Sequence, residues 1–169
     1  AVISNNRIYT NASVGVLITS GSSNVVVRNV IYSNGAAGIH VNGTTTNNAI
    51  IANVVWRNSG RGIYVDQGRG TVVKNNIAGS NGAHGIEDNI IAVGTVVEYN
   101  DSFGHTGIFN NYQPVVLGAG PGNIAVAALF VNPTATNFKL SGPCPLSPAV
   151  DAGTTNGLTR YDGTAVNGT

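Results

Sequence analysis

The chain has 169 residues, of which only 9% are charged, and its eight Lys and Arg nearly balance its seven Asp and Glu. Eight scattered cations cannot build the dense basic patch of a nucleic-acid-binding protein, and no apolar run is long enough for membrane insertion. Its 23 Asn and 23 Gly exclude long amphipathic helices, because both residues favour turns over helices.

Short runs of β-branched residues recur along the chain, and each is followed by an asparagine. The runs are Val2–Ile3, Val25–Val27, Ala49–Ile51, Thr71–Val73 and Thr95–Val97. The asparagines that follow them are Asn5, Asn29, Asn53, Asn75 and Asn100. This regular return predicts that the chain is built from internal repeats of one structural unit.

Two further series keep the same period. A second asparagine recurs as Asn11, Asn34, Asn58 and Asn81. A glycine recurs as Gly15, Gly38, Gly62, Gly85 and Gly107, and opens an alternating segment such as Gly38-Ile39-His40-Val41. A period near 23 with three short strands and no helix pattern predicts one turn of a parallel β-solenoid. Asparagine suits its corners, because it tolerates left-handed backbone angles and its amide can bond to the asparagines above and below.

Two of these repeats resemble the right-handed parallel β-helix repeat of the pectin-lyase-like superfamily. They run from Asn29 to Asn34 with Gly38-Ile39-His40-Val41, and from Asn53 to Asn58 with Gly62-Ile63-Tyr64-Val65. The resemblance covers roughly residues 1–110 and implies an all-β, right-handed parallel β-helix of about five to six coils. The superfamily includes polysaccharide lyases, hydrolases, epimerases, phage tailspikes and non-catalytic proteins, so the resemblance leaves the function open.

The segment 111–169 differs in composition from the repeats. All six prolines lie there, and proline cannot donate to a strand ladder, so we expect a last coil and a capping segment within the same domain. Its stretches Leu129–Pro133 and Ser147–Gly153 are similar to the C-terminal coil of secreted bacterial β-helix proteins. That similarity implies a secreted or cell-surface protein of bacterial or phage type. No N-terminal cap is visible before Val2, so we expect either that upstream residues are missing, as in a piece of a longer protein, or that another chain covers this end. The single cysteine, Cys144, excludes an intrachain disulfide.

Two columns of side chains are expected to point outward on neighbouring strands. One contains Leu17, His40, Tyr64, Glu87 and Phe109, and the other contains Tyr9, Tyr32, Trp56, Ala78 and Phe103. Aromatic faces along a rigid groove suit stacking against sugar rings, so we predict substrate binding by Tyr32, Trp56, Arg61 and Asp66. The alternative is that these aromatics stack on one another as ladder packing.

A catalytic hypothesis uses the same groove. His40 and Tyr64 would act as base and acid, while Glu87, Asp66 or Arg61 would orient the base or neutralise a substrate carboxylate. No metal site is predicted and no cofactor is required, although Ca²⁺ would serve a polyuronate substrate.

The first strand of each repeat is apolar on both faces, with Val26, Ile50, Val72 and Val96 expected to point outward. We expect the proline-rich tail to cover this strand face; the alternative is a homo-oligomer interface. The leading functional prediction is an extracellular polysaccharide-recognition β-helix. The alternatives are a polysaccharide lyase, epimerase or hydrolase, and a non-catalytic structural or adhesin solenoid.

Overall fold

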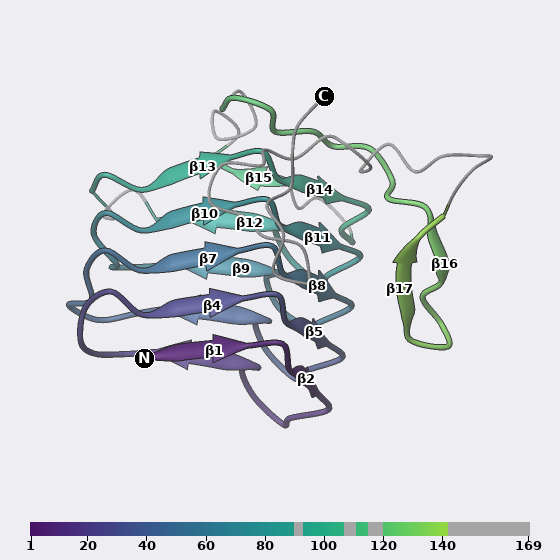
Figure 1. Ribbon diagram of the computed structural model, residues 1–169, viewed down its shortest axis with the longest axis horizontal. Coiled ribbons are helices and arrows are strands. Elements are labelled where there is room, and N and C mark those ends of the chain that lie inside the picture. Colours follow the sequence, from purple (N-terminus) through teal and green to yellow (C-terminus); the bar gives the residue numbers. More distant parts are fainter. Residues whose placement is uncertain (90–92, 107–110, 115–119, 142–169) are drawn as a thin grey trace, which may run out of the picture.

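The computed structural model describes residues 1–89, 93–106, 111–114 and 120–141, which form a parallel β-solenoid of five coils (Figure 1). Each coil contributes one strand to each of three sheets. The first sheet contains β1 (Val2–Ser4), β4 (Val25–Val27), β7 (Ala49–Ile51), β10 (Val72–Lys74) and β13 (Val96–Glu98). The second contains β2 (Arg7–Tyr9), β5 (Val30–Tyr32), β8 (Val54–Trp56), β11 (Ile77–Gly79) and β14 (Asp101–Phe103). The third contains β3 (Val16–Ile18), β6 (Ile39–Val41), β9 (Ile63–Val65), β12 (Ile86–Asp88) and β15 (Tyr112–Gln113).

The core is a stack of aliphatic residues at equivalent positions of successive coils. In the first two sheets the middle residue of each strand points inward, as at Val26 and Ile31, which are 0% exposed. In the third sheet the two flanking residues point inward, as at Ile39 and Val41. Each such burial contributes roughly 2 kcal/mol of hydrophobic stabilisation. The all-β solenoid predicted from the repeats is thus confirmed, and a bridge from Asp101 to Ile124 starts a sixth coil.

Rows of asparagine side chains run along two corners of the solenoid. In the first row each residue donates both its backbone N–H and its Nδ2 to the Oδ1 atom of the next, at 2.9–3.2 Å. This row consists of Asn6, Asn29, Asn53, Asn76, Asn100 and Asn123. The second row consists of Asn11, Asn34, Asn58 and Asn81. The inner members of both rows, from Asn29 to Asn100 and from Asn34 to Asn81, are at most 1% exposed, so these bonds remove the cost of taking their amides out of water.

The predicted first row was wrong by one residue in two coils. Asn5 and Asn75 do not belong to it; they have left-handed φ angles of 57° and 56° and immediately precede the row members Asn6 and Asn76. The corner requires a left-handed residue directly before the row, and asparagine is suited to both positions. Adjacent asparagines therefore leave the sequence pattern ambiguous.

The predicted outward column of the first sheet was also out of phase. Val26 and Ile50 point inward and are fully buried, whereas Val72 and Val96 point outward. The reason is the register: Val72 pairs with Ala49 rather than with Ile50. An oligomer formed through the outer face of this sheet remains a prediction.

The outward column of the second sheet contains Tyr9, Tyr32, Trp56, Gly79 and Phe103. Ala78 was predicted in this column, but it points inward and is 0% exposed. A Cβ atom on Gly79 would lie 2.3 Å from Cζ3 of Trp56 and 2.9 Å from Cζ of Phe103. The glycine therefore makes room for the Trp56 ring.

A β-hairpin formed by β16 (Phe130–Asn132) and β17 (Asn137–Leu140) packs against this aromatic column (Figure 1). Phe130 meets the Trp56 ring edge-on with centroids 5.3 Å apart, and Phe138 lies 5.6 Å from the Tyr32 ring. The hairpin of the described part of the tail thus packs against the second sheet. The predicted covering of the first sheet by the proline-rich tail stays a prediction. The rest of the predicted capping segment lies outside the described residues.

Candidate functional site on the third sheet

The outer face of the third sheet presents one side chain from the middle of each strand. Strand pairing aligns Leu17, His40, Tyr64, Glu87 and Gln113 in one column. Their neighbours on either side, such as Ile63 and Val65, are buried in the core, which forces the middle side chain outward. Phe109 was predicted at the end of this column and lies outside the described residues; Gln113 pairs with Glu87 instead.

Tyr64 stands at the centre of this face between side chains of the adjacent coils. The His40 ring stacks on it with centroids 4.7 Å apart and an angle of 23°. The Arg61 guanidinium lies 4.2 Å from the Tyr64 centroid, and it also forms an ion pair with Glu87 of the following coil. The stacking and cation–π contacts therefore engage the faces of the Tyr64 ring. What this side chain offers a ligand is its hydroxyl group and its edge.

The ion pair between Arg61 and Glu87 sets the charge balance of the face. Their hydrogen bond holds the pKa of Arg61 above its usual value. Two opposite charges at contact largely cancel, so Arg61 adds little net attraction for an acidic ligand. Glu87 is likewise engaged and is not a free carboxylate.

Asp66 follows β9 and provides a further acidic group. Its Oδ1 atom accepts a hydrogen bond of 2.6 Å from Nδ2 of Asn89. The Tyr64 hydroxyl also interacts with Asp66 and Asn89, and burial, followed by the Asp66 hydrogen bond, raises the pKa of Tyr64 above 10.0. Tyr64 is thus protonated at neutral pH and can donate a hydrogen bond.

His40 is electrically neutral at the same pH. Burial lowers the pKa of His40 below 6.5, an effect that the nearby Asp66 partly opposes. Its Nε2 atom is buried and has no hydrogen-bond partner. A neutral imidazole beside a protonated phenol is an arrangement that can accept a proton at one group and donate one from the other.

The structure brings together five of the seven predicted site residues and separates the other two. His40, Arg61, Tyr64, Asp66 and Glu87 share the third sheet and its margins. Tyr32 and Trp56 lie on the second sheet, and Trp56 is only 7% exposed beneath the hairpin. Within the described residues the two columns therefore lie on different sheets, and the hairpin buries Trp56 and Phe103 of the second column while Tyr9 remains 50% exposed. Substrate binding by Tyr32 and Trp56 stays a prediction.

Sequence reasoning missed Asn89 and Gln113. Asn89 lies 23 residues after Asp66, so the repeat period alone places the two side chains next to each other. Gln113 could not be found in this way, since the period changes in the last coil.

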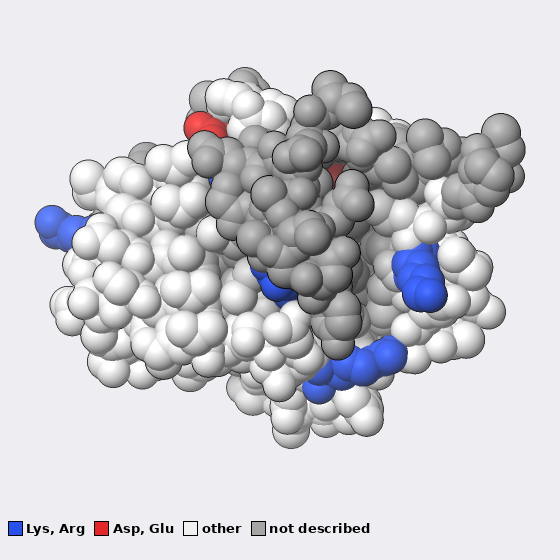
Figure 2. Space-filling view, viewed as in Figure 1, with Lys and Arg blue, Asp and Glu red and all other residues white. Residues whose placement is uncertain are grey.

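The described residues contain no group of three or more His, Cys, Asp and Glu that could hold a metal ion. They also contain no helix with the length and hydropathy needed to cross a membrane. Figure 2 shows the Lys and Arg side chains visible on one face as isolated positions rather than a continuous patch.

Comparison with known proteins bears directly on the fold. A family model described as "Right handed beta helix region" matches residues 1–117. The chain belongs to this right-handed β-helix family. No curated protein matches the chain.

Two solved structures of the periplasmic alginate epimerase AlgG are similar to this β-helix protein. The T265N T268M double mutant has a TM-score of 0.60 and 21% identity, over 66% of this chain and 30% of the AlgG chain. The other AlgG structure has a TM-score of 0.60 and 19% identity, over 73% and 32% of the two chains. This chain spans about a third of those proteins, and the likeness concerns the fold.

Proposed function

We propose that the outer face of the third sheet binds a segment of a polysaccharide. The observation that carries this proposal is the convergence of Tyr64, Asp66 and Glu87, with His40 and Arg61, from three successive coils onto one partly exposed surface. Hydroxyl, carboxylate and amide groups on a rigid scaffold are suited to sugar hydroxyls, which both donate and accept hydrogen bonds. The ligand is held by these polar groups and by ring edges, not by open aromatic faces.

The structural neighbours support a carbohydrate ligand. Both are described as an alginate epimerase, and alginate is a polysaccharide. Their description as periplasmic also supports the expectation of a secreted or cell-surface protein. A purely structural or adhesin role would make no use of the polar groups gathered around Tyr64.

Catalysis on the same face is the second candidate, favoured by the His40–Tyr64 pair. Burial lowers the pKa of His40 and raises that of Tyr64, which favours a neutral imidazole beside a protonated phenol. In a polysaccharide lyase or epimerase, the imidazole would accept the proton next to a uronate carboxyl while the phenol donates one. In this mechanism Glu87 positions Arg61, and bound Ca²⁺ would be an additional source of positive charge.

Binding to polysaccharides tests the proposal directly. The protein is passed over immobilised alginate, polygalacturonate and a neutral β-glucan, with and without Ca²⁺, and the eluate is analysed for new fragments. We expect retention on at least one polymer and an approximately fivefold loss of affinity in Tyr64→Phe, as for one lost hydrogen bond. New unsaturated or epimerised products that are absent with the His40→Gln variant would support catalysis on this face in addition to binding.

Tyr9→Phe is the matched control, because Tyr9 is also stacked on a ring, that of Tyr32 at 4.9 Å, but on the second sheet. This variant should bind like the original protein. Equal behaviour of the two Tyr→Phe variants, or no retention on any polymer, would contradict the proposal.

A further inference from the structure

The chain contains five Asn-Gly dipeptides, and the fold sets one of them apart. Three lie within the described residues, at Asn34, Asn42 and Asn81. Asn34 and Asn81 belong to the second asparagine row and are 0% exposed, whereas Asn42 is half-buried in the turn that leaves β6. The backbone nitrogen of a glycine can attack the side chain of the asparagine before it, because glycine has no Cβ atom to obstruct the approach. The three sites therefore share one reactive sequence in different surroundings.

The attacking atom, the glycine nitrogen, is differently bonded at the three sites. The N–H groups of Gly35 and Gly82 each donate to a backbone carbonyl of the preceding coil at 2.8 Å. These bonds belong to the ladder between coils and hold both nitrogens in it. Within the described residues the N–H of Gly43 makes no bond of this kind, and it donates instead to the Oδ1 atom of Asn42 at 2.6 Å. The Gly43 nitrogen is thus available without the loss of any contact between coils.

The same contact brings the nitrogen close to the carbon that it must attack. Oδ1 is bonded to Cγ of Asn42, so a nitrogen 2.6 Å from Oδ1 stands beside that carbon. In the second row the side-chain amides are held differently. Nδ2 of Asn34 donates to the next row member at 2.8 Å, and Oδ1 of Asn81 accepts from the preceding one at 3.0 Å. Turning either amide toward its glycine would break buried hydrogen bonds that no water replaces.

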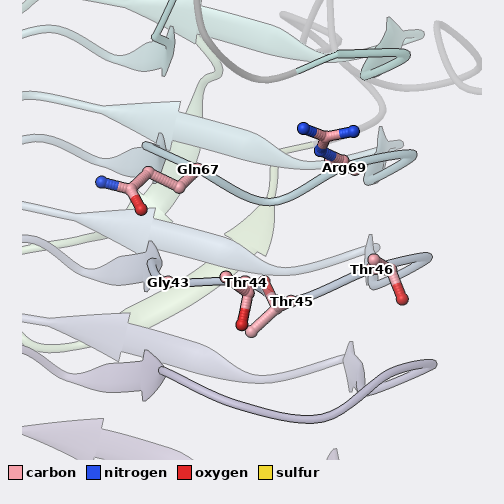
Figure 3. A pocket seen from close by; sticks show the side chains of 6 residues that line it. All are labelled: Gly43, Thr44, Thr45, Thr46, Gln67 and Arg69. Atoms are coloured by element: carbon pink, nitrogen blue, oxygen red, sulfur yellow. The ribbon is translucent and has the colours of Figure 1, made fainter.

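Solvent reaches the turn that contains Gly43. This glycine and Thr44 border a cavity of about 500 Å³ between the turns after β6 and β9. Figure 3 shows Gly43 where the first of these turns begins and Thr44 next to it, and Thr44 is exposed. Water can therefore enter and a small leaving group can escape, which the buried second row does not allow.

We propose that Asn42 is a site of spontaneous modification in the folded protein, at which its side-chain amide becomes a carboxylate. The Gly43 nitrogen bonds to Cγ of Asn42 and loses its proton to solvent, while the Cγ–Nδ2 bond breaks and Nδ2 takes up a proton and leaves as ammonia. Water then opens the resulting imide ring at either carbonyl. The products are aspartate and isoaspartate, in which the main chain continues through Cγ. Water is the only further reactant, and the inference goes beyond the proposed function because it requires no ligand.

The new carboxylate lies at the margin of the outer face of the third sheet. Val41 pairs with Val65, so the residues that follow them, Asn42 and Asp66, occupy equivalent positions of adjacent coils. Adjacent strands are about 4.8 Å apart, so two acidic side chains at these positions repel one another. The formal net charge falls from +1 to 0, since one neutral amide becomes one carboxylate. The modification thus makes this margin more acidic without any change of sequence.

Mass spectrometry of peptides from the folded chain measures the modification at each asparagine. The protein is incubated in neutral buffer below its unfolding temperature and then digested, and fragment ions assign each conversion to one residue. We expect conversion at Asn42 to be at least about tenfold faster than at Asn34 or Asn81, because the buried row must open before those two can react. Equal rates at the three sites, including no conversion at any of them, would overturn the inference.

The urea-unfolded chain is the matched control, since the dipeptides are the same and only the fold is removed. The advantage of Asn42 should disappear there; if it persists, local sequence and not structure causes it, and the inference fails. The Asn42→Asp variant supplies a reference peptide. One product of the incubated protein should coelute with this peptide, and a second product of equal mass, isoaspartate, should not. A single coeluting product would mean direct hydrolysis of the amide and would overturn the attack by Gly43.

Discussion

The Nδ1 atom of His105 accepts a hydrogen bond of 3.1 Å from the backbone N–H of Asn81, at the place where an asparagine stands in the coils before it. An accepting Nδ1 requires the proton on Nε2, which lies 3.1 Å from the Ser102 hydroxyl. That hydroxyl in turn donates to the carbonyl of Asn111 at 2.6 Å. His105 therefore extends the second asparagine row, and the Ser102–His105 contact is not a nucleophile paired with a base.

Acid should destabilise the protein through His105. Burial lowers the pKa of His105 to about 4, below the 6.5 of an exposed imidazole. The unfolded chain thus binds a proton that the folded chain resists. The contribution of neutral His105 to the free energy of unfolding should be fully present above pH 6.5. It should be lost as the pH falls from 6.5 through 4, by up to about 3 kcal/mol. Urea unfolding between pH 4 and 7 measures this loss, and His105→Asn should flatten the profile; an unchanged profile in that variant would assign the loss to other groups.

Asp101 should have the opposite pH dependence. Burial raises its pKa to about 7, and its Oδ2 atom is buried without a partner. The pKa of Asp101 in the unfolded chain is 3.8, so the folded chain holds the proton more tightly. The stability that comes from this protonated carboxyl is fully present at low pH and is lost as the pH rises through 7. Asp101→Asn keeps an acceptor for the Val126 N–H and removes the charge, so at pH 8 it should stabilise the protein by about 2 kcal/mol. Thermal unfolding at pH 5 and pH 8 checks this, and an equal shift at both values would contradict it.

Trp56 is the single tryptophan of the chain and reports on the packing of the hairpin. Phe130→Ala removes the ring that meets Trp56 edge-on, which should cost about 3 kcal/mol of stability and let water reach the indole. The tryptophan emission should shift to longer wavelength while the circular dichroism of the strands is kept. Lys139→Ala, at an exposed position of the same hairpin, is the control; an unshifted emission in Phe130→Ala would show that the hairpin does not shield the ring.

Gly79→Ala should destabilise the second sheet, because its Cβ would overlap the Trp56 ring. Overpacking of this kind costs about 1–3 kcal/mol. Replacing Trp56 with Leu as well should relieve the overlap, so that the double variant loses less stability than the sum of the single variants. Urea unfolding of all four proteins measures this coupling, and additive losses would rule out the steric explanation.

The sequence predicted the strands and their stacking because each coil repeats the same inward positions. Val26, Ile50 and Val73 align through backbone pairing that a period near 23 anticipates. The repeat period also indicates that His105 takes the place of an asparagine, since it lies 24 residues after Asn81 of the second row. The period also predicts that His40, Tyr64 and Glu87 lie in one column, and strand pairing confirms it.

Two kinds of feature could not be predicted from the sequence: the exact residue that occupies each repeat position, and the contacts of the segment that has no repeats. The period varies between coils, so it could not decide whether Asn5 or Asn6 joins the row, or whether Val72 faces in or out. The cover over Trp56 comes from the β16–β17 hairpin, which has no counterpart in the coils and therefore no periodic signal. Contacts between distant segments of unlike sequence are decided by packing, which no local pattern encodes.

The asparagine rows give the two ends of the solenoid opposite electrical character. Along the first row each Nδ2 donates to the Oδ1 atom of the asparagine in the next coil, so the bonds between asparagines all run in one direction along the axis. The same Nδ2 atoms also donate to backbone carbonyls of the preceding coil. Asn6 and Asn11 stand with their oxygens at the N-terminal end of their rows. A two-fold related copy would meet those oxygens with oxygens of its own. Any assembly that continues the rows must therefore be polar, head to tail, as in a filament and not in a symmetric dimer.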